Sequence, residues 1–492
     1  MFMLYLYVSD YGMKLHLKEI LGFQNCFFTT TRRMSFSGKP PNILLHAPSN
    51  TPNKSLLTVE IIEKIFKKDK YIVYPVSDNE LTTESWKKNA TMLILQTHVD
   101  KKFSTNISDF LKLGGKVLSL PRQVEFSDNL QQKENYICLD GEFNEELLRK
   151  VFSEIYGSDA VQSNVENESL SFSFGYLISE EKSNLPHLKI LKQSKITLDF
   201  NDYEDCQQEA SENYLPIKSR SSCNQFDGKL YLNNLTTSNL GRPLIFVPVI
   251  TSSMLPFEGK TLGHGFTFVP LRQSAGVGRG GNKWLSPEGC SMFTMQIFLK
   301  LDSFLGRRPS LMQHLVALAH VEAVRSMSEF EDIDIRIKWP NDIYYGSSVK
   351  LGGVIAKSSI TRDDLTVVVG AGFNLNNAQP TTSLNQILKD VHKTELSQEV
   401  LIARIFNCLE KIIEKCNNGQ YSEVESLYYK YWLHSHQHII VRDKESDSSV
   451  IVVGIDEFGF LRVKDTNDVQ FSVMDDGNSF DMMQGLVKPK LR

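Results

Sequence analysis

The sequence predicts a multidomain protein of α/β and α+β class, with a parallel α/β domain first, a larger mixed domain next and a small β-barrel last. Three observations carry this prediction. Apolar strands alternate with amphipathic helices over residues 41–155, a pattern typical of parallel sheets. Apolar residues become dense again over residues 226–434. Residues 435–492 hold short apolar runs separated by turn residues, which favours a small barrel.

Length and composition set the limits of this prediction. A chain of 492 residues has room for about three domains. The formal net charge of −4 argues against a protein whose main task is to neutralise nucleic-acid backbones, since such proteins are strongly basic. The seven cysteines are dispersed and form no CxxC pair, which indicates reduced thiols rather than a disulfide framework or a zinc site.

Residues 1–40 are predicted to be a leader in front of the first domain. No run in the chain approaches the ~18 apolar residues of a membrane span. Residues 13–34 are basic, contain Ser and Thr, and have a single acid, Glu19. This composition indicates either a mitochondrial transit peptide or an unstructured leader. We therefore expect a cytoplasmic protein, with a mitochondrial form if the leader is a transit peptide.

The first domain, residues 41–155, contains clear strand and helix signals. The runs NILLHAP, YIVYPV and TMLILQT are expected strands, and TVEIIEKIFKKD is an expected amphipathic helix. In ISDFLKLGGKVLSLP, Gly114 and Gly115 stop a helix and another strand follows. Residues 156–225 are rich in Ser, Glu, Asn and Gln, so we expect a partly ordered connector there.

The larger domain, residues 226–434, is expected to contain a core helix and sharply ended strands. SLMQHLVALAHVEAVRSM has apolar residues at helical spacing, and its His314 and His320 are expected to be core histidines rather than metal ligands. In IDIRIKWPND the apolar residues alternate with Lys338 and other polar ones, and Pro340 ends the strand. LTVVVGAGFNLNN is a further apolar strand that ends in a turn.

The loop Gly276–Trp284, GVGRGGNKW, contains four glycines, two cations and an indole. Glycines let backbone N–H groups approach an anion closely, and the planar guanidinium of Arg279 suits phosphate or carboxylate oxygens. The loop lacks the Lys-Ser/Thr ending of a P-loop, and by itself it is equally consistent with a connector. Lys338 is either an ordinary solvated lysine or a second cation that neutralises charge developing at this loop.

Four motifs in one order resemble the biotin protein ligases, specifically the eukaryotic holocarboxylase synthetases. They are GRGGNKWLSPEGC, KWPNDIYY with KLGGVI, GAGFN, and the terminal DDGNSFDM. The resemblance covers roughly residues 226–492. It implies a catalytic domain related to class II aminoacyl-tRNA synthetases and lipoate ligases at 226–434, with an SH3-like domain at 435–492.

The first domain resembles the glutamine-amidotransferase-like domain that precedes some eukaryotic ligases. Active members of that group carry a nucleophilic cysteine on a tight turn between a strand and a helix. The matching strand end here reads GGKVLSLPRQ, with Ser119 and no cysteine. Without a thiolate nucleophile, residues 41–155 are predicted to be non-catalytic.

The resemblance implies an ATP-dependent ligase that activates biotin as biotinyl-5′-AMP, releases pyrophosphate, and transfers biotin to a lysine of a carboxyl-carrier domain. Both biotin and ATP are anionic, so cations, preorganised N–H groups and Mg²⁺ are expected at the site. The implied partners are acetyl-CoA, pyruvate, propionyl-CoA and methylcrotonyl-CoA carboxylases, without membrane or nucleic acid. The alternatives are a lipoate or octanoate ligase of the same fold, a DNA-binding biotin-responsive regulator, and a scaffold that has lost its chemistry.

The resemblance also implies the site residues. Arg279 and Lys338 are the implied catalytic residues. The implied biotin-binding residues are Ser252, Ser253, Met254, Gln273, Gly276, Val277, Gly278, Arg279 and Lys338. The implied adenylate-binding residues are Gly278, Arg279, Trp284, Lys338 and Asn374.

Plainer interpretations of these positions stay open. Ser252–Met254 also fits a simple polar turn, Trp284 a core tryptophan, and Asn374 a turn asparagine. Asp342 fits either a metal ligand or the cap of a turn, so the metal ligands are unknown. Val277 departs from the family, since many relatives have a longer polar or basic side chain there. We expect the backbone of the loop to carry more of the phosphate binding in this chain.

Overall fold

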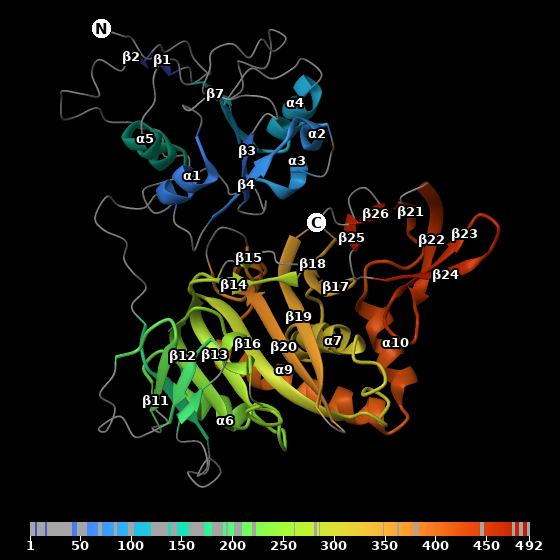
Figure 1. Cartoon of the computed structure of the whole chain (residues 1–492). Helices are drawn as coiled ribbons and strands as arrows, with labels where there is room; N and C mark the ends of the chain where they lie inside the picture. Colours follow the sequence, from blue (N-terminus) through green and yellow to red (C-terminus); the bar gives the residue numbers. More distant parts are fainter. Residues whose placement is uncertain are drawn as a thin grey trace. The chain divides into compact units, whose positions relative to one another are not determined.

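The structure is a computed structural model in which two compact units are distinguished: residues 1–167 with 379–381, and residues 168–378 with 382–492 (Figure 1). It describes residues 5–6, 15–16, 42–46, 57–66, 71–82, 86–96, 103–119, 136–138, 145–156, 172–179, 190–192, 195–200, 209–218, 223–259, 261–279, 283–284, 286–347, 349–361, 364–377, 382–442, 447–474, 478–481 and 486–489. Except for the short strands β1 (Tyr5–Leu6) and β2 (Leu15–His16), the predicted leader lies outside these residues.

The first unit is built on a five-stranded sheet in the order β4-β3-β5-β6-β7, and every pair in it is parallel. The predicted parallel N-terminal sheet is therefore confirmed. Its strands are β3 (Asn42–His46), β4 (Ile72–Val76), β5 (Met92–Leu95), β6 (Lys116–Ser119) and β7 (Tyr136–Cys138). Its helices are α1 (Val59–Ile65), α2 (Asp78–Leu81), α3 (Trp86–Asn89), α4 (Ser104–Lys112) and α5 (Glu145–Tyr156).

Both faces of this sheet are covered, which explains why its strands are apolar throughout rather than alternating. Successive residues of β3 point to opposite faces, so Ile43 and Leu45 join one core and Leu44 joins the other. The first core includes α1 and α5, and the second includes α3 and α4. Figure 1 shows these two groups of helices on opposite sides of the sheet.

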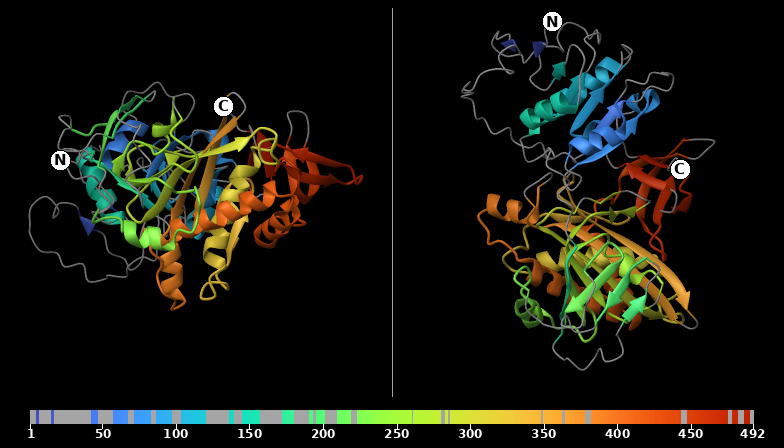
Figure 2. Two further views of the ribbon diagram at one scale, coloured as in Figure 1. Left: turned by 90° about the horizontal axis from the view of Figure 1, so that it is seen from below. Right: turned by 60° about the vertical axis from the view of Figure 1, so that its left-hand side comes forward.

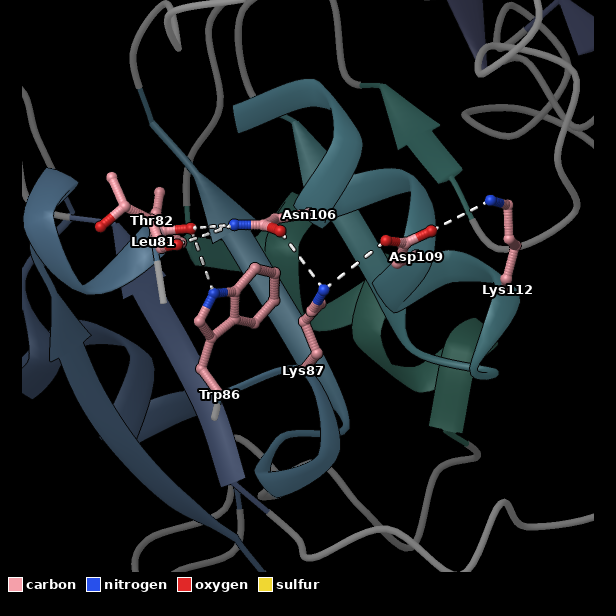
Figure 3. Close-up of polar contacts among 7 residues, drawn as sticks. All are labelled: Leu81, Thr82, Trp86, Lys87, Asn106, Asp109 and Lys112. Atoms are coloured by element: carbon pink, nitrogen blue, oxygen red, sulfur yellow. Dashed lines mark hydrogen bonds and ion pairs between the residues drawn. The ribbon is translucent and has the colours of Figure 1, made fainter. Parts of the chain in front are cut away.

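A partly buried polar network joins α2, α3 and α4 (Figure 3). Lys87 is 4% exposed, and its ammonium donates to Asn106 Oδ1 at 3.3 Å and pairs with Asp109 at 3.6 Å. Asn106 in turn donates to the carbonyls of Leu81 and Thr82 at the end of α2. The indole of Trp86 also donates to the Leu81 carbonyl, at 3.3 Å. Every donor in this network has a partner, so the short helix α2 is held firmly in place.

The second unit contains an eleven-stranded mixed sheet in the order β17-β18-β19-β20-β16-β13-β12-β8-β11-β10-β9. Its strands are β8 (Gly175–Ile178), β9 (Ile190–Lys192), β10 (Thr197–Asp199), β11 (Tyr214–Lys218), β12 (Leu244–Ile250), β13 (Thr267–Gln273), β16 (Cys290–Lys300), β17 (Ile335–Lys338), β18 (Asp342–Tyr345), β19 (Val349–Thr361) and β20 (Asp364–Asn374).

Four of these strands, β8 to β11, come from the segment that we predicted to be a connector. Its polar composition hides short apolar runs, and Leu198, Leu215 and Ile217 are buried in a core of their own with β12 and β13. Three to five residues per strand are too few for a periodic signal to stand out against polar neighbours. In the structure this segment therefore extends the large sheet.

Helices cover one face of the large sheet. They are α6 (Gly228–Asn234), α7 (Leu311–Arg325), α8 (Leu384–Asp390), α9 (Gln398–Asn417) and α10 (Tyr421–Tyr431). The α7 helix confirms the predicted core helix, and Figure 2 shows it next to α9. His314 and His320 are core histidines as predicted: His314 Nδ1 lies 3.1 Å from the Tyr428 hydroxyl, and His320 Nδ1 lies 2.7 Å from the Val316 carbonyl.

The C-terminal part of this unit is a smaller sheet in the order β24-β23-β22-β21-β26-β25. The first four strands are antiparallel, and β26 runs parallel to β21. The strands are β21 (His438–Arg442), β22 (Asp447–Ile455), β23 (Leu461–Asp465), β24 (Gln470–Val473), β25 (Asn478–Asp481) and β26 (Leu486–Pro489). Within the described part of the chain, no helix has both the length and the apolar character needed to cross a membrane.

Candidate active site

The predicted site residues meet because β12 and β13 are parallel neighbours whose carboxyl ends lie at one edge of the sheet. The segment after β12 and the segment after β13 are joined by backbone bonds, with Ser274 N donating to Ile250 O at 3.1 Å and Ala275 N to Thr251 O at 2.8 Å. The polar turn Ser252–Met254 and the loop that begins at Gly276 therefore start side by side. The register of the sheet fixes this arrangement.

The polar turn is buried and tied to Gln273. Ser252 and Ser253 are 4% and 5% exposed. Gln273 Oε1 accepts from the Ser253 backbone N–H at 2.8 Å and from its hydroxyl at 3.1 Å, while the same hydroxyl lies 2.7 Å from Thr294 Oγ1. The Gln273 amide nitrogen donates to Ser286 Oγ at 3.1 Å. Both ends of the Gln273 amide are thus engaged within the protein, so Gln273 positions the turn.

The glycine loop begins as a small hairpin of β14 (Gly276–Val277) and β15 (Lys283–Trp284). A Cβ at position 276 would lie 2.5 Å from the Trp284 carbonyl oxygen, so only glycine fits there. Val277, by contrast, is 46% exposed. Gly278 and Arg279 follow as half-buried residues, and residues 280–282 lie outside the described ones.

The indole of Trp284 packs against Gly372 of the GAGFN strand. A Cβ at position 372 would come within 2.6 Å of Cε2 and Nε1 of the indole, so the glycine provides the space that the ring occupies. The indole Nε1–H is buried and has no hydrogen-bond partner. A buried donor without a partner costs stability, which favours a ligand acceptor at this point.

The ammonium of Lys350 lies over this indole ring. Its ammonium lies 5.9 Å from the Trp284 ring centroid and pairs with Asp342 Oδ1 at 2.7 Å. Asp342 is therefore half of an ion pair, which neither the metal-ligand nor the turn-cap interpretation anticipated. Lys350 is the lysine of the KLGGVI motif but was not among the predicted site residues, because an isolated lysine at a strand start carries no chemical signal of its own.

Lys338 lies on the same face but further out. The register places Lys338, Asp342, Gly353 and Gly372 in one row across β17 to β20. The row spans three inter-strand steps, about 14 Å in all. The ammonium of Lys338 donates to the Tyr344 hydroxyl at 3.3 Å and lies 5.0 Å from that ring. Its predicted place on the polar face of the strand is confirmed by the alternating burial of β17.

Asn374 ends β20 and is buried. Its Oδ1 accepts from Cys290 Sγ at 3.4 Å and from Asn377 Nδ2 at 3.2 Å. Burial raises the pKa of the Cys290 thiol to about 12, so this thiol stays protonated and remains a donor. These two donors orient the Asn374 amide at the edge of the sheet where the glycine loop begins, since Cys290 and Asn374 are paired across β16 and β20.

The described residues do not form a metal site of their own. No group of three or more His, Cys, Asp or Glu side chains within them is arranged to hold an ion. Asp342, the carboxylate in the row of Lys338 and Gly353, is paired with Lys350. The predicted Mg²⁺ therefore has no cage of protein ligands in the described part of the chain, and we derive no step through it.

Known relatives share this region. A model of the Biotin/lipoate A/B protein ligase family matches residues 254–374, which contain Met254, the glycine loop and Asn374. "Biotin--protein ligase 2" of Arabidopsis thaliana is 33% identical over 288 residues, which cover 55% of this chain and 84% of that protein. The chain belongs to the biotin protein ligase family. The predicted family and the predicted ligase class are thereby confirmed.

Coverage differs among the relatives. The human "Biotin--protein ligase" is 37% identical over 315 residues, which cover 61% of this chain but only 43% of the human protein. This chain thus spans less than half the length of that relative. Among solved structures, the biotin protein ligase from Aquifex aeolicus in complex with biotin and ATP is 20% identical with a TM-score of 0.39, covering 48% of this chain and 96% of that one.

Proposed function

We propose that this protein is an ATP-dependent biotin–protein ligase that forms biotinyl-5′-AMP and transfers biotin to a lysine of a carboxyl-carrier domain. The observation that carries the proposal is the meeting of Trp284, Gly372 and the Lys350–Asp342 pair on one face of the sheet, beside the Ser253–Gln273 turn. A planar apolar cover, a fixed cation and buried hydroxyls together suit a ligand with a polar ring and an anionic end. Family membership names biotin as that ligand.

The first half-reaction explains why cations are needed. The biotin carboxylate attacks the α-phosphate of ATP, the bond to pyrophosphate breaks, and a mixed anhydride forms. Two anions must approach each other, so Lys350 and Arg279 lower the barrier by neutralising charge that develops between them. Trp284 excludes water from the anhydride, which would otherwise hydrolyse. Lys338 acts from further away than we first expected.

The second half-reaction consumes the anhydride. An uncharged lysine amine of the carrier domain attacks the carbonyl carbon of biotin, an amide bond forms, and AMP leaves with the bonding electron pair. We propose the carrier domains of biotin-dependent carboxylases as acceptors, including those that act on acetyl-CoA, pyruvate, propionyl-CoA and methylcrotonyl-CoA. Mg²⁺ would enter with the nucleotide, since it prefers phosphate oxygens with few protein ligands.

The finer fold assignments belong to the same proposal. We assign the first unit to the glutamine-amidotransferase-like group on its parallel order β4-β3-β5-β6-β7. The large sheet is assigned to the class II synthetase-like catalytic fold, and β21 to β26 to an SH3-like domain. The boundaries remain those predicted, except that strands from residues 156–225 belong with the catalytic sheet. A cytoplasmic location, with a mitochondrial form, is proposed on the leader composition alone.

Biotin-dependent exchange of pyrophosphate into ATP tests this function, because it isolates the first half-reaction. We expect exchange with biotin and none with lipoate or octanoate in its place. Arg279→Ala should lower the exchange rate by roughly a hundredfold or more, since it removes a charge-stabilising group. Folded protein that shows no exchange with biotin, or equal exchange with lipoate, would refute the proposal.

A further inference from the structure

The first unit has a polar cluster at the carboxyl ends of β4, β3 and β5 that the ligase reaction does not use. In the strand order β4-β3-β5, β4 lies on one side of β3 and β5 on the other. The direction in which successive strands are added to the sheet therefore reverses at β3. In doubly wound sheets, ligands bind at this reversal, outside the carboxyl ends of the strands. His46 ends β3, Gln96 directly follows β5, and Asp78 begins α2 just after β4.

These three side chains are in direct contact. Gln96 Nε2 donates to the His46 carbonyl at 3.0 Å, and His46 Nε2 lies 2.9 Å from Asp78 Oδ1. A carboxylate can only accept, so His46 Nε2 carries the hydrogen in this pair. The network of Lys87, Trp86 and Asn106 holds the other end of α2, which keeps Asp78 in position (Figure 3).

Two buried acceptors in this cluster have no partner. His46 is 1% exposed and its Nδ1 makes no hydrogen bond; Gln96 is 9% exposed and its Oε1 makes none. When the single hydrogen of an imidazole is on Nε2, Nδ1 carries a lone pair and acts as an acceptor. A buried polar atom without a partner costs stability, so each such atom in a native protein needs an explanation. A bound ligand that donates hydrogen bonds to these two acceptors would explain them.

The negative charge of the cluster favours a ligand whose hydrogen-bond donor is positively charged. Its free groups are all acceptors, and the carboxylate of Asp78, 46% exposed, gives it a negative charge on the side open to solvent. Within the described residues no lysine or arginine pairs with Asp78. An ammonium group has three donors and no acceptor, so it matches this set in both charge and hydrogen bonding.

We propose that the first unit binds a small molecule with a primary ammonium group at the carboxyl ends of β3 and β5. His46 Nδ1 and Gln96 Oε1 accept from the ammonium, and Asp78 supplies the counter-charge. A neutral amide would meet the two acceptors but gain nothing from Asp78. A quaternary ammonium would meet the charge but has no hydrogen to donate.

Saturation-transfer difference NMR on the full chain tests this, with methylammonium as the probe and acetamide and tetramethylammonium as comparators. We expect saturable binding of methylammonium that is stronger than that of either comparator. Asp78→Asn removes the charge and His46→Gln keeps a donor for Asp78 while removing Nδ1, so each should weaken binding roughly tenfold. Glu145→Gln is the matched control, because Glu145 is a similarly exposed carboxylate of the same unit that pairs with Arg149 on α5, and it should leave binding unchanged.

Thermal melting and pyrophosphate exchange confirm that each variant is folded. The proposal is overturned if folded wild-type protein shows no saturable methylammonium binding, in which case water fills the cluster. It is also overturned if Asp78→Asn binds as well as wild type, or if acetamide or tetramethylammonium binds as tightly as methylammonium.

Discussion

The sheet edges of the two units differ in which polar atoms they leave unsatisfied. At the ligase site Nε1–H of Trp284 is a buried donor without a partner and the cation Lys350 lies beside it, although Asn377 Oδ1, next to Asn374, is a buried acceptor without a partner. At the carboxyl ends of β3 and β5 the atoms without partners are acceptors, on His46 and Gln96. The first edge therefore suits an oxygen-rich anionic ligand and the second a nitrogen donor. If both proposals hold, the carboxyl ends of a parallel sheet and of a mixed sheet select opposite chemistry through a few side chains.

The largest expected effect is the difference in pyrophosphate exchange between alanine variants of Lys350 and Lys338. Lys350→Ala should lower biotin-dependent pyrophosphate exchange by about a thousandfold, because the cation beside the indole is lost and Asp342 is left unpaired. Lys338→Ala should lower it only about threefold, since that ammonium is held by the Tyr344 hydroxyl further out on the sheet.

Exchange rates of the two variants, measured at saturating biotin and ATP, decide the point. Equal losses, or a larger loss for Lys338→Ala, would restore Lys338 as the main cation of the site. Lys350→Arg is a useful partner variant, because it keeps the charge while changing its geometry.

Buried histidines make the second unit sensitive to acid. Burial lowers the pKa of His434 to about 4 and that of His320 to about 4, against an ordinary value near 6.5. The folded state holds both rings neutral, so the unfolded state binds more protons between those values. The free energy of unfolding is therefore highest above pH ~6.5. It falls as the pH drops toward ~4, by about 3 kcal/mol for each ring.

Calorimetric unfolding of the full chain between pH 7 and 4 checks this. The transition of the second unit should move to lower temperature as the pH falls. His320→Phe should flatten the dependence, because it removes one titrating ring while keeping an aromatic next to Phe293. A pH-independent transition would contradict the burial of these rings.

A smaller effect is expected from Gly372→Ala, which adds one methyl group where the Trp284 indole lies. The ring must move away, so the KM for ATP or biotin should rise roughly tenfold while the protein stays folded. Gly353→Ala is the comparison variant in the same row of the sheet, because its Cβ would meet the Asp342 carboxylate at 3.2 Å and the end of the Lys350 side chain at 3.7 Å but would leave the indole in place. Tryptophan fluorescence on ligand addition would report the displaced ring. If both variants behave alike, Trp284 does not cover the ligand.

The fold was largely predictable and the site only partly so, for one physical reason. Long apolar runs such as NILLH and the helix at Leu311–Arg325 can be recognised in the sequence, because apolar residues recur along them at the spacing of buried positions. Strands of three to five residues, as in β8 to β11, are decided by their neighbours in space. Likewise, nothing local distinguishes Lys350 from Lys338. Only the register of β17 to β20 shows which ammonium lies by the indole.

The smallest expected effect concerns Val277, where the family resemblance led us to expect a longer polar or basic side chain. Val277 is 46% exposed at the start of the glycine loop, and its backbone is paired with Lys283 across the hairpin. A lysine fits an exposed β position without displacing anything, because its ammonium can reach solvent. Val277→Lys should therefore leave retention of the adenylate unchanged or raise it about twofold, through one added cation near phosphate. Retention of radiolabelled biotinyl-5′-AMP on gel filtration measures this, with Val277→Thr as the uncharged control. A large loss in the lysine variant alone would mean that the side chain at 277 packs inward when ligand binds, so that the loop relies on shape rather than on its main-chain N–H groups.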